Sequence, residues 1–393
     1  MQVETSSRLP DVDSASAAHT GRCAAFIRGR IAEAGGSVSF AEYMQHALYA
    51  PGLGYYAAGA TKLGEAGDFI TAPELSPLFG SVIARQCAGV LDSVGGGSIL
   101  ELGAGSGRLA IDVLKKLSEL KALPDRYLIL EVSAELAERQ RAAIETEVPE
   151  LAPRVTWLAE LPTGHRGVIL ANEVIDALPV ERFVRRDSVR QLRVTIEGDT
   201  FRFVEADAPR NLESAVAAIE ADLGNRLAEG YVSEVSLGAA GWLADVLASL
   251  DAGIALLFDY GLGRREYYAP DRNAGWLRCH FRHHAHSDPL ILAGVQDITA
   301  WVDFSLVAAA AIESGSELVG YTDQASFLIG GGLEQELAGL ASLAPAAQAE
   351  LSRQVKVLTL PGEMGERFKC LGIRRGEAAV PGGFAFADRT HTL

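Results

Sequence analysis

The strongest constraint on the fold is a short apolar segment that runs directly into a glycine-rich loop. Residues 99–108 read ILELGAGSGR, so that Gly103, Gly105 and Gly107 follow the apolar residues at alternate positions. Glycines after a buried strand let the backbone approach a ligand closely, and a helix that begins there directs its first N–H groups at the same point. In an α/β fold this point lies at the carboxyl end of the sheet, where small molecules bind. The alternative is a tight strand-to-helix turn without a ligand.

Apolar and amphipathic segments alternate on both sides of this loop. Strands are expected over residues 98–102, 127–132, 154–158, 168–171 and 254–259, and helices over 109–120 and 134–144. This alternation is typical of right-handed βαβ units around a parallel sheet. Residues 182–205 interrupt it with alternating apolar and polar positions, which predict a hairpin that turns at Gly198 and Asp199. The sequence therefore predicts an α/β fold with an inserted hairpin.

The chain of 393 residues is long enough for two or three domains. Ser39 and Glu42 have the S-x-x-E spacing of a capping box, which predicts a short helix through Tyr49. We expect a disordered tail over residues 1–20, a helical lobe over 21–92, a larger domain over 93–375 with an insertion at 182–230, and a C-terminal tail over 376–393. The last third is expected to contain helices near 297–313 and 324–328 and strands near 318 and 368–373.

Charge and composition exclude several classes of protein. Thirty-five Lys and Arg residues against fifty-one Asp and Glu residues give a formal charge of −16, so no nucleic-acid-binding surface is expected. No apolar run reaches the ~18 residues that a membrane-spanning helix needs, so no membrane insertion is expected. Four widely spaced cysteines without a CxxC pair argue against a disulfide framework and a zinc ribbon. The acidic N-terminus lacks the features of a secretory or mitochondrial signal, which predicts a cytoplasmic protein.

A histidine-rich segment is the one feature that suggests a metal. The run H-x-x-H-H-x-H comprises His280, His283, His284 and His286, and imidazoles three or four residues apart can bind zinc. No cysteine pair accompanies the run, and we expect no metal site. The segment is expected to be a loop that meets a partner protein or packs through hydrogen bonds.

The spacing of the three glycines separates two classes of nucleotide-like ligand. A dinucleotide-binding loop has the pattern G-x-G-x-x-G, but its last position is Arg108 in this chain. The G-x-G-x-G spacing, preceded by Glu101, resembles motif I of class I S-adenosylmethionine-dependent methyltransferases. The resemblance implies that Glu101 lies near the cationic amino acid part of the cofactor and that the glycines line its adenosine and methionine. A second acid, Glu131, ends the next strand and can accept hydrogen bonds from both ribose hydroxyls, unless it is a solvated strand end.

Several further segments resemble the MidA-like family of protein arginine methyltransferases. The resemblance extends over about residues 21–375 and is carried by residues 39–49, 54–56, 67–74, 172–179, 258–261 and 296–299. It implies a Rossmann-like class I methyltransferase core, S-adenosyl-L-methionine as cofactor, and an arginine of a protein as methyl acceptor. Mitochondrial members of this family assist the assembly of respiratory complex I, so a subunit of that complex is the suggested partner.

The segment from Gly64 to Glu74 is expected to close over the cofactor as a lid, chiefly on this resemblance. Its glycines permit hinge motion, and Asp68 and Thr71 supply polar groups that can contact the cofactor. The alternative is a rigid connector between two parts of the chain.

Glu173 is the first candidate for holding the methyl acceptor. A guanidinium is cationic and a poor nucleophile, and a carboxylate can orient its planar group through two hydrogen bonds while offsetting its charge. Asn172 and Asp176 lie at the same strand end and can assist. The alternative for Glu173 is an N-cap or an ion pair at the start of a helix. Asp259 and Tyr260, which end another buried strand, are weaker candidates of the same kind.

Three functional classes remain open at this point. The first is a methyltransferase that acts on an arginine of a protein partner, the second is a small-molecule O- or N-methyltransferase, and the third is a cofactor-binding assembly factor without turnover. Methyl transfer is an in-line attack on a sulfonium carbon, which requires alignment and the exclusion of water rather than a metal. Neither the oligomeric state nor the identity of the acceptor arginine follows from the sequence.

Overall fold

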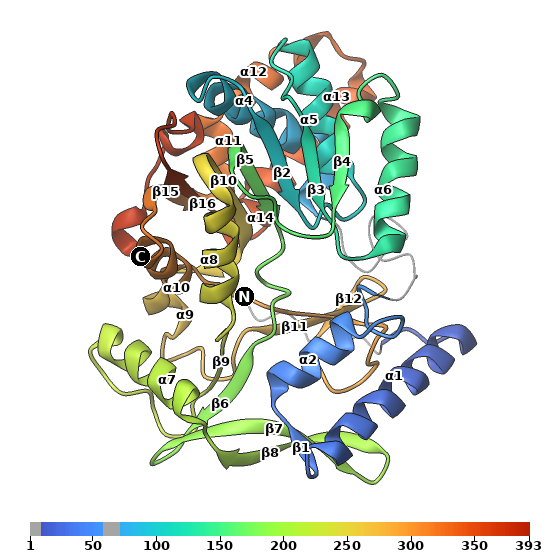
Figure 1. Cartoon of the computed structure of the whole chain (residues 1–393), viewed down its shortest axis with the longest axis vertical. Helices are drawn as coiled ribbons and strands as arrows, with labels where there is room; N and C mark the ends of the chain where they lie inside the picture. Colours follow the sequence, from blue (N-terminus) through green and yellow to red (C-terminus); the bar gives the residue numbers. More distant parts are fainter. Residues whose placement is uncertain (1–8, 58–70) are drawn as a thin grey trace. The chain divides into compact units, whose positions relative to one another are not determined.

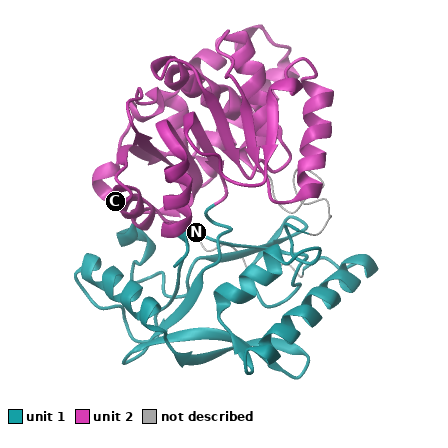
Figure 2. Ribbon diagram, viewed as in Figure 1, with its two compact units in different colours: residues 1–69, 175–239, 264–301 teal, residues 70–174, 240–263, 302–393 magenta. Residues whose placement is uncertain are grey.

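The computed structural model describes residues 9–57 and 71–393, and the chain divides into two compact units (Figure 2). Unit 1 combines residues 1–69, 175–239 and 264–301, and unit 2 combines residues 70–174, 240–263 and 302–393. Each unit is therefore assembled from three separate stretches of sequence.

Unit 2 is built on a sheet of eight strands that is mostly parallel (Figure 1). The strands are β2 (Ser98–Leu102), β3 (Tyr127–Leu130), β4 (Val155–Leu158), β5 (His165–Asn172), β10 (Leu250–Leu262), β14 (Val302–Asp303), β15 (Glu317–Asp323) and β16 (Phe368–Arg375). They run in the order β15-β16-β10-β5-β2-β3-β4, with β14 paired to β10. Because β2 pairs in parallel with both β3 and β5, the strand order reverses at β2. Such a reversal opens a crevice at the carboxyl ends of the strands, where ligands bind.

The helices of unit 2 differ in how many of their residues are buried. The helix α5 (Arg108–Glu119) follows the glycine loop and buries most of its first half against the core of unit 2, whereas α6 (Ala134–Glu147) buries only Gln140 and Ile144. The other helices of unit 2 are α3 (Ala72–Leu75), α4 (Pro77–Ser93), α8 (Ala239–Ser249), α10 (Phe304–Glu313), α11 (Gln324–Gly330), α12 (Leu333–Glu336), α13 (Pro345–Thr359) and α14 (Met364–Arg367). Single 3-10 turns lie at Ala152–Arg154, Leu340–Ser342, Gly382–Phe384 and Thr390–Thr392.

Unit 1 contains two antiparallel sheets and its own apolar core. The five-stranded sheet comprises β1 (Ser37–Val38), β6 (Glu181–Arg185), β7 (Val189–Glu197), β8 (Thr200–Asp207) and β9 (Val232–Val235). The three-stranded sheet comprises β11 (Leu277–Phe281), β12 (His284–His286) and β13 (Asp297–Ala300). The core of unit 1 is formed by residues of α1 (Ser14–Glu33) and α2 (Phe40–Tyr49) together with residues of β7, β8, β11 and β13. The other helices of unit 1 are α7 (Arg210–Leu223) and α9 (Arg264–Tyr267).

Most local predictions are confirmed. Both hydrogen bonds of the capping box form, since Ser39 Oγ accepts from the Glu42 N–H at 3.1 Å and the Ser39 N–H donates to the Glu42 carboxylate at 2.9 Å. The helix that follows ends at Tyr49, as expected. The hairpin also forms, with Glu197 of β7 opposite Thr200 of β8, so the two intervening residues make the turn. The predicted strands of the parallel sheet lie within a few residues of their expected bounds.

Both expected tails differ from the structure. Residues 1–8 lie outside the described part, but α1 begins at Ser14, because the Asp13 side chain accepts hydrogen bonds from the N–H groups of Ala15 and Ser16 at 2.8 and 2.9 Å. At the other end, Phe384 is buried, and its ring lies where a Cβ on Gly320 or Gly372 would stand. Residues 14–20 therefore extend a helix, and the segment after residue 375 packs on unit 2.

The helix predicted over residues 297–313 was wrong in its first part. Asp297–Ala300 form the strand β13, which pairs with β11, and the helix α10 begins only at Phe304. The β-branched Ile298 and Thr299 favour a strand, and the side chain of Asp303 caps the helix through the N–H groups of residues 305 and 306.

The compact units divide the chain differently from the expected domains. The helices α3 and α4, which fall within the expected lobe at residues 21–92, belong to unit 2, whereas residues 175–239 and 264–301 join the N-terminal segment in unit 1. Sequence reasoning missed this because each unit is assembled from three separate segments, and no local pattern reports which distant segments pack together.

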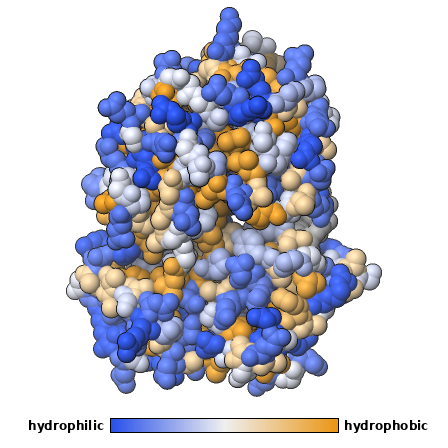
Figure 3. Space-filling model, in the orientation of Figure 1, coloured by the Kyte–Doolittle hydropathy of each residue, from blue (hydrophilic) through white to orange (hydrophobic). Residues whose placement is uncertain are grey.

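The lengths and polarities of the described helices bear on membrane insertion. Within residues 9–57 and 71–393, every helix is too short or too polar to cross a bilayer. Hydrophilic residues cover most of the face shown in Figure 3, with smaller apolar areas among them.

We predict that Gly167→Ala strongly destabilises the protein. Gly167 of β5 lies opposite Ser98 of β2 and Gly253 of β10, and a Cβ at this position would stand 2.1 Å from the Ser98 carbonyl oxygen. The substitution should lower the free energy of unfolding by at least about 2 kcal/mol, measured by urea denaturation. Gly89→Ala is the matched control, because Gly89 is exposed on α4 with open space around it, and it should leave stability unchanged or slightly higher. Equal stability of the two variants would contradict the role of this close strand contact.

Candidate functional site

The glycine loop joins β2 to α5 at the point where the strand order reverses. Gly103, Gly105 and Gly107 have φ angles of 63°, 57° and 86°, which side chains with a Cβ rarely adopt. Gly107 is also the N-cap of α5 and has no side chain to cap the helix, so the first turn keeps its positive end toward the crevice. The backbone conformation thus requires the three glycines that the sequence singles out.

Glu101 is a buried carboxyl on the strand that precedes the loop. Its side chain is 3% exposed and accepts a hydrogen bond from the Tyr127 hydroxyl at 2.6 Å. Burial raises the pKa of Glu101 to about 7, the Tyr127 hydrogen bond opposes this rise, and the charge of Glu131 adds to it. A cationic group beside Glu101 would favour its ionised form.

Glu131 follows β3 and is held by two hydrogen bonds. One carboxylate oxygen accepts from the Ser133 N–H at 2.9 Å, and the other accepts from the Gln140 amide at 2.9 Å. Burial raises the pKa of Glu131, and these two hydrogen bonds, together with one from the Val132 N–H, partly offset the rise. Glu131 is therefore not the freely solvated strand end of the alternative interpretation, and it lies close enough to Glu101 for their charges to interact.

Sequence reasoning missed three residues of this region, which are Gln140, Trp157 and Val132. Gln140 is completely buried on α6 and bonds to Glu131, to the Gly105 carbonyl at 3.0 Å and to the Trp157 indole at 2.9 Å. Val132 is 79% exposed directly after Glu131, which is unusual for a large apolar side chain. None of these residues belongs to a recognisable sequence motif. The only indication in the sequence was Gln140, an amide among charged residues on a helix with few apolar positions.

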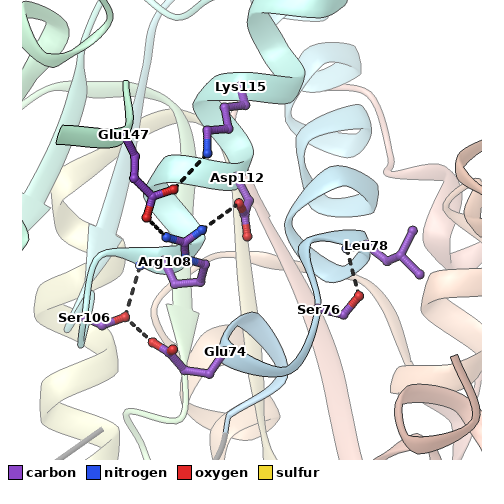
Figure 4. A network of polar contacts seen from close by, with 8 residues as sticks. All are labelled: Glu74, Ser76, Leu78, Ser106, Arg108, Asp112, Lys115 and Glu147. Atoms are coloured by element: carbon purple, nitrogen blue, oxygen red, sulfur yellow. Dashed lines mark hydrogen bonds and ion pairs between the residues drawn. The ribbon is translucent and has the colours of Figure 1, made fainter. Parts of the chain in front are cut away.

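Arg108, which replaces the third glycine of a dinucleotide loop, belongs to a polar network (Figure 4). Its guanidinium bonds to Glu147 on α6 and lies 3.6 Å from Asp112, and Lys115 binds the second oxygen of Glu147 at 2.9 Å. Burial raises the pKa of Asp112 to about 6, although Arg108 opposes this shift. The network links α5 to α6 beside the loop.

The described end of the expected lid is bonded to the glycine loop. Ser106 Oγ accepts from the Arg108 N–H at 3.3 Å and donates to the Glu74 carboxylate (Figure 4). Thr71 is the N-cap residue of α3 and makes no side-chain capping bond. Asp68 lies outside the described residues, so the lid and its contacts with the cofactor stay a prediction.

Asn172 and Glu173 lie at the carboxyl end of β5, where Val174 approaches the glycine loop. A Cβ on Gly103 would lie 3.4 Å from Val174 Cγ2. Glu173 has a positive φ of 54°, donates its N–H to the Phe258 carbonyl at 2.8 Å and accepts from the Asn172 amide at 3.1 Å. The chain then enters a turn rather than a helix, so Glu173 is not an N-cap. A non-glycine residue in this conformation is typical of functional sites.

Asp176 belongs to unit 1, although it is only three residues away in the sequence. It is buried, and its carbonyl accepts from the Ala300 N–H at 2.9 Å. Burial raises the pKa of Tyr49 and Tyr56, and the negative charges of Asp297 and Asp176 raise it further. The three predicted acceptor residues are thus divided, with two in the unit of the glycine loop and one in the other unit.

The remaining candidates from the sequence are Asp259, Tyr260 and the histidine run. Asp259 is buried in β10, and one of its carboxylate oxygens accepts from the Tyr260 N–H at 2.9 Å. The histidine run forms the paired strands β11 and β12 rather than a loop, and burial lowers the pKa of His280 to about 4. Across residues 9–57 and 71–393, no group of three or more His, Cys, Asp or Glu side chains has an arrangement that could hold a metal ion.

Comparisons with known proteins agree with this geometry. A family model described as "Putative S-adenosyl-L-methionine-dependent methyltransferase" matches residues 82–322. The mitochondrial protein arginine methyltransferase NDUFAF7 of Danio rerio is 31% identical over 86% of this chain and 83% of its own length, and that of Homo sapiens is 30% identical over 85% and 79%. A crystal structure from Burkholderia thailandensis bound to S-adenosyl-homocysteine is 39% identical, covers 98% of this chain and 100% of its own, and has a TM-score of 0.92.

The comparisons contradict the predicted cytoplasmic location. The curated relatives are named as mitochondrial proteins and not as cytoplasmic ones. The prediction was wrong because it rested on the lack of a targeting pattern and on free cysteines. All four cysteines are indeed free and buried, but this fits any reducing compartment.

The sequence and structural matches cover most of the chain and both of its units. They also confirm the predicted Rossmann-like α/β methyltransferase fold and the family suggested by the motifs. The chain therefore belongs to the family of S-adenosyl-L-methionine-dependent methyltransferases that includes the mitochondrial protein arginine methyltransferases NDUFAF7.

Proposed function

We propose that this protein transfers a methyl group from S-adenosyl-L-methionine to an arginine side chain of a protein partner. The observation that carries the proposal is the position of Asn172 and Glu173, because the next residue, Val174, lies 3.4 Å from the place that a Cβ on Gly103 of the glycine loop would occupy. The same end of the sheet thus offers groups for a cofactor on one strand and groups for an acceptor on the neighbouring strand. The relatives named as protein arginine methyltransferases support this choice of acceptor.

The residues at the end of β2 and β3 fit the cofactor. The buried Glu101 suits the cationic amino acid part, and the anchored Glu131 suits the ribose hydroxyls. Gly103, Gly105 and Gly107 keep the space beside the loop free of side chains. The bound cofactor supplies an electrophilic methyl group, and the protein has to align the acceptor with it and exclude water.

Asn172 and Glu173 can supply the alignment of the acceptor. Asn172 Oδ1 is buried and has no hydrogen-bond partner among the described residues, so it can accept an N–H from a guanidinium. The Glu173 carboxylate can accept a second N–H of the same planar group and offset its positive charge beside the cationic cofactor. The left-handed backbone conformation of Glu173 sets the direction of its Cα–Cβ bond. Asp176 is a further acceptor-side candidate within unit 1.

The partner is proposed to be an arginine-bearing subunit of respiratory complex I, on the resemblance to the MidA-like family. The formal charge of −16 favours the approach of a basic segment through long-range attraction. Transfer of radiolabelled methyl groups to purified complex I subunits, followed by peptide mass mapping, tests the proposal. Label on an arginine supports it. Label on metabolites alone would indicate a small-molecule methyltransferase, and cofactor binding without any label would indicate an assembly factor without turnover.

We predict that Glu173→Gln preserves cofactor binding but lowers arginine methylation by about 100-fold or more, because the acceptor loses its charged orienting group. Cofactor affinity measured by calorimetry should stay within about twofold of the parent. Glu138→Gln is the control, since Glu138 is an exposed carboxylate on α6, and its turnover should equal that of the parent. Full turnover in the Glu173 variant would remove this residue from the acceptor site.

Gly105→Val is expected to abolish measurable cofactor binding. A β-branched side chain is disfavoured at a φ of 57° and would occupy space beside the loop. The dissociation constant should rise by about 100-fold or more, equivalent to about 2.7 kcal/mol. Gly198→Val has a nearly identical φ of 59° in the hairpin of unit 1, and it should bind cofactor normally. Unchanged affinity in the Gly105 variant would refute the role of the loop.

The affinity for the cofactor should fall as the pH decreases from 8 to 6. Burial raises the pKa of Glu101 to about 7, so this carboxyl is mostly ionised at pH 8 and mostly protonated at pH 6. Only the ionised form attracts the cationic cofactor, and the dissociation constant should increase by up to about tenfold per pH unit below the pKa. Glu101→Gln should bind more weakly and flatten this pH profile in calorimetric titrations. A profile that is equally steep in both proteins would assign the pH dependence to another group.

A further inference from the structure

Gln140 is an unusual residue to find inside the protein. It is 0% exposed and shares the buried face of α6 with Ile144 alone. A buried amide costs stability unless its polar atoms are hydrogen-bonded, and an apolar side chain would serve packing equally well. The presence of an amide here therefore needs an explanation beyond the packing of α6 on unit 2.

The three hydrogen bonds of Gln140 define the orientation of its amide. The Trp157 indole nitrogen can only donate, so the atom 2.9 Å from it must be the amide oxygen. The amide nitrogen then faces two acceptors, the Gly105 carbonyl at 3.0 Å and a Glu131 carboxylate oxygen at 2.9 Å. Both donors and the acceptor of the side chain are in use.

These bonds connect the two halves of the cofactor site. One donor holds the glycine loop at Gly105, and a Cβ on Gly107 would lie 3.6 Å from Gln140. The other donor holds Glu131, whose remaining oxygen is bound by the Ser133 N–H. Both carboxylate oxygens are thus fixed in direction, and since a carboxylate has about four acceptor sites, Glu131 can still accept a hydrogen bond from a ligand.

We infer that Gln140 is a positioning residue that orients Glu131 toward the 2′- and 3′-hydroxyls of the cofactor ribose and thereby makes the enzyme select nucleosides with an intact diol. The inference rests on the proposed role of Glu131 and does not depend on the methyl acceptor. Glutamine is suited to this position because it donates to two acceptors and accepts from one donor. An ionised glutamate would keep only the bond from Trp157 and would repel Glu131, and leucine would lose all three bonds.

The test compares two probes, S-adenosyl-homocysteine and its 2′-deoxyribose analogue, by calorimetry. In the parent protein the analogue should bind about tenfold or more weakly, because one hydrogen bond to a charged group is lost. In Gln140→Leu and Gln140→Glu this preference should shrink to about threefold or less, while the affinity for S-adenosyl-homocysteine also falls. A residue that only supports packing would weaken both probes equally and leave the preference unchanged.

Gln86 offers a matched control within the same unit. Its buried amide donates to the Gly331 carbonyl at 2.7 Å and accepts from the Gly383 N–H at 3.1 Å, away from the glycine loop. Gln86→Leu should lose stability but keep the preference for the diol. If Gln140→Leu does not fold, Trp157→Phe still tests the inference, because it removes the donor that fixes the amide and should lower the preference by about threefold.

The outcomes separate the inference from the functions proposed above. A full preference in the Gln140 and Trp157 variants overturns the role of Gln140 and leaves that of Glu131 intact. No preference in the parent overturns both roles, whereas arginine methylation, which is measured separately, is unaffected by either result.

Discussion

The pairing of β2 with β3 on one side and β5 on the other is the arrangement on which the whole site depends. Parallel registers bring the ends of these three strands to one edge of the sheet, where Leu102 lies beside both Leu130 and Ala171. The glycine loop, Glu131 and the Asn172–Glu173 pair each follow one of these strands. Chemistry that is spread over more than seventy residues of sequence is thus concentrated at one edge, and the close contact at Gly167 helps to keep the strands in this register.

The electrostatics of the site favour a cation over a dinucleotide. Burial raises the pKa of both Glu101 and Glu131, and the charge of Glu131 makes ionisation of Glu101 still less favourable. A positively charged ligand relieves this repulsion, whereas a pyrophosphate would increase it. Arg108 is the nearest cation in the sequence to the loop, but its guanidinium is engaged by Glu147 and Asp112. The acidic strand ends and the occupied arginine are therefore both consistent with the proposed binding of a sulfonium ligand.

The parts of the fold that sequence could predict are those encoded by neighbouring residues. The glycine loop, the capping box at Ser39 and the hairpin at Gly198 each carry a local pattern, and the strand ends that hold Glu101 and Glu131 follow from the apolar segments before them. Gln140 could not be found, because its importance arises from contacts with Gly105 and Trp157, which lie 35 and 17 residues away. The strand at Asp297–Ala300 and the composition of the two units likewise depend on partners distant in sequence, and no periodicity reports those partners.

The interleaved course of the chain has a consequence for its synthesis on the ribosome. The three-stranded sheet of unit 1 needs β13, which ends at residue 300, although the first helix of that unit begins at residue 14. In unit 2, β16 at residues 368–375 lies between β10 and β15, so this sheet closes only after residue 375 has been synthesised. The edge of β10, which ends at residue 262, therefore stays without its neighbour in the nascent polypeptide until residues 368–375 have been synthesised. Unpaired strand edges of this kind promote aggregation, so the topology favours assistance by chaperones during synthesis.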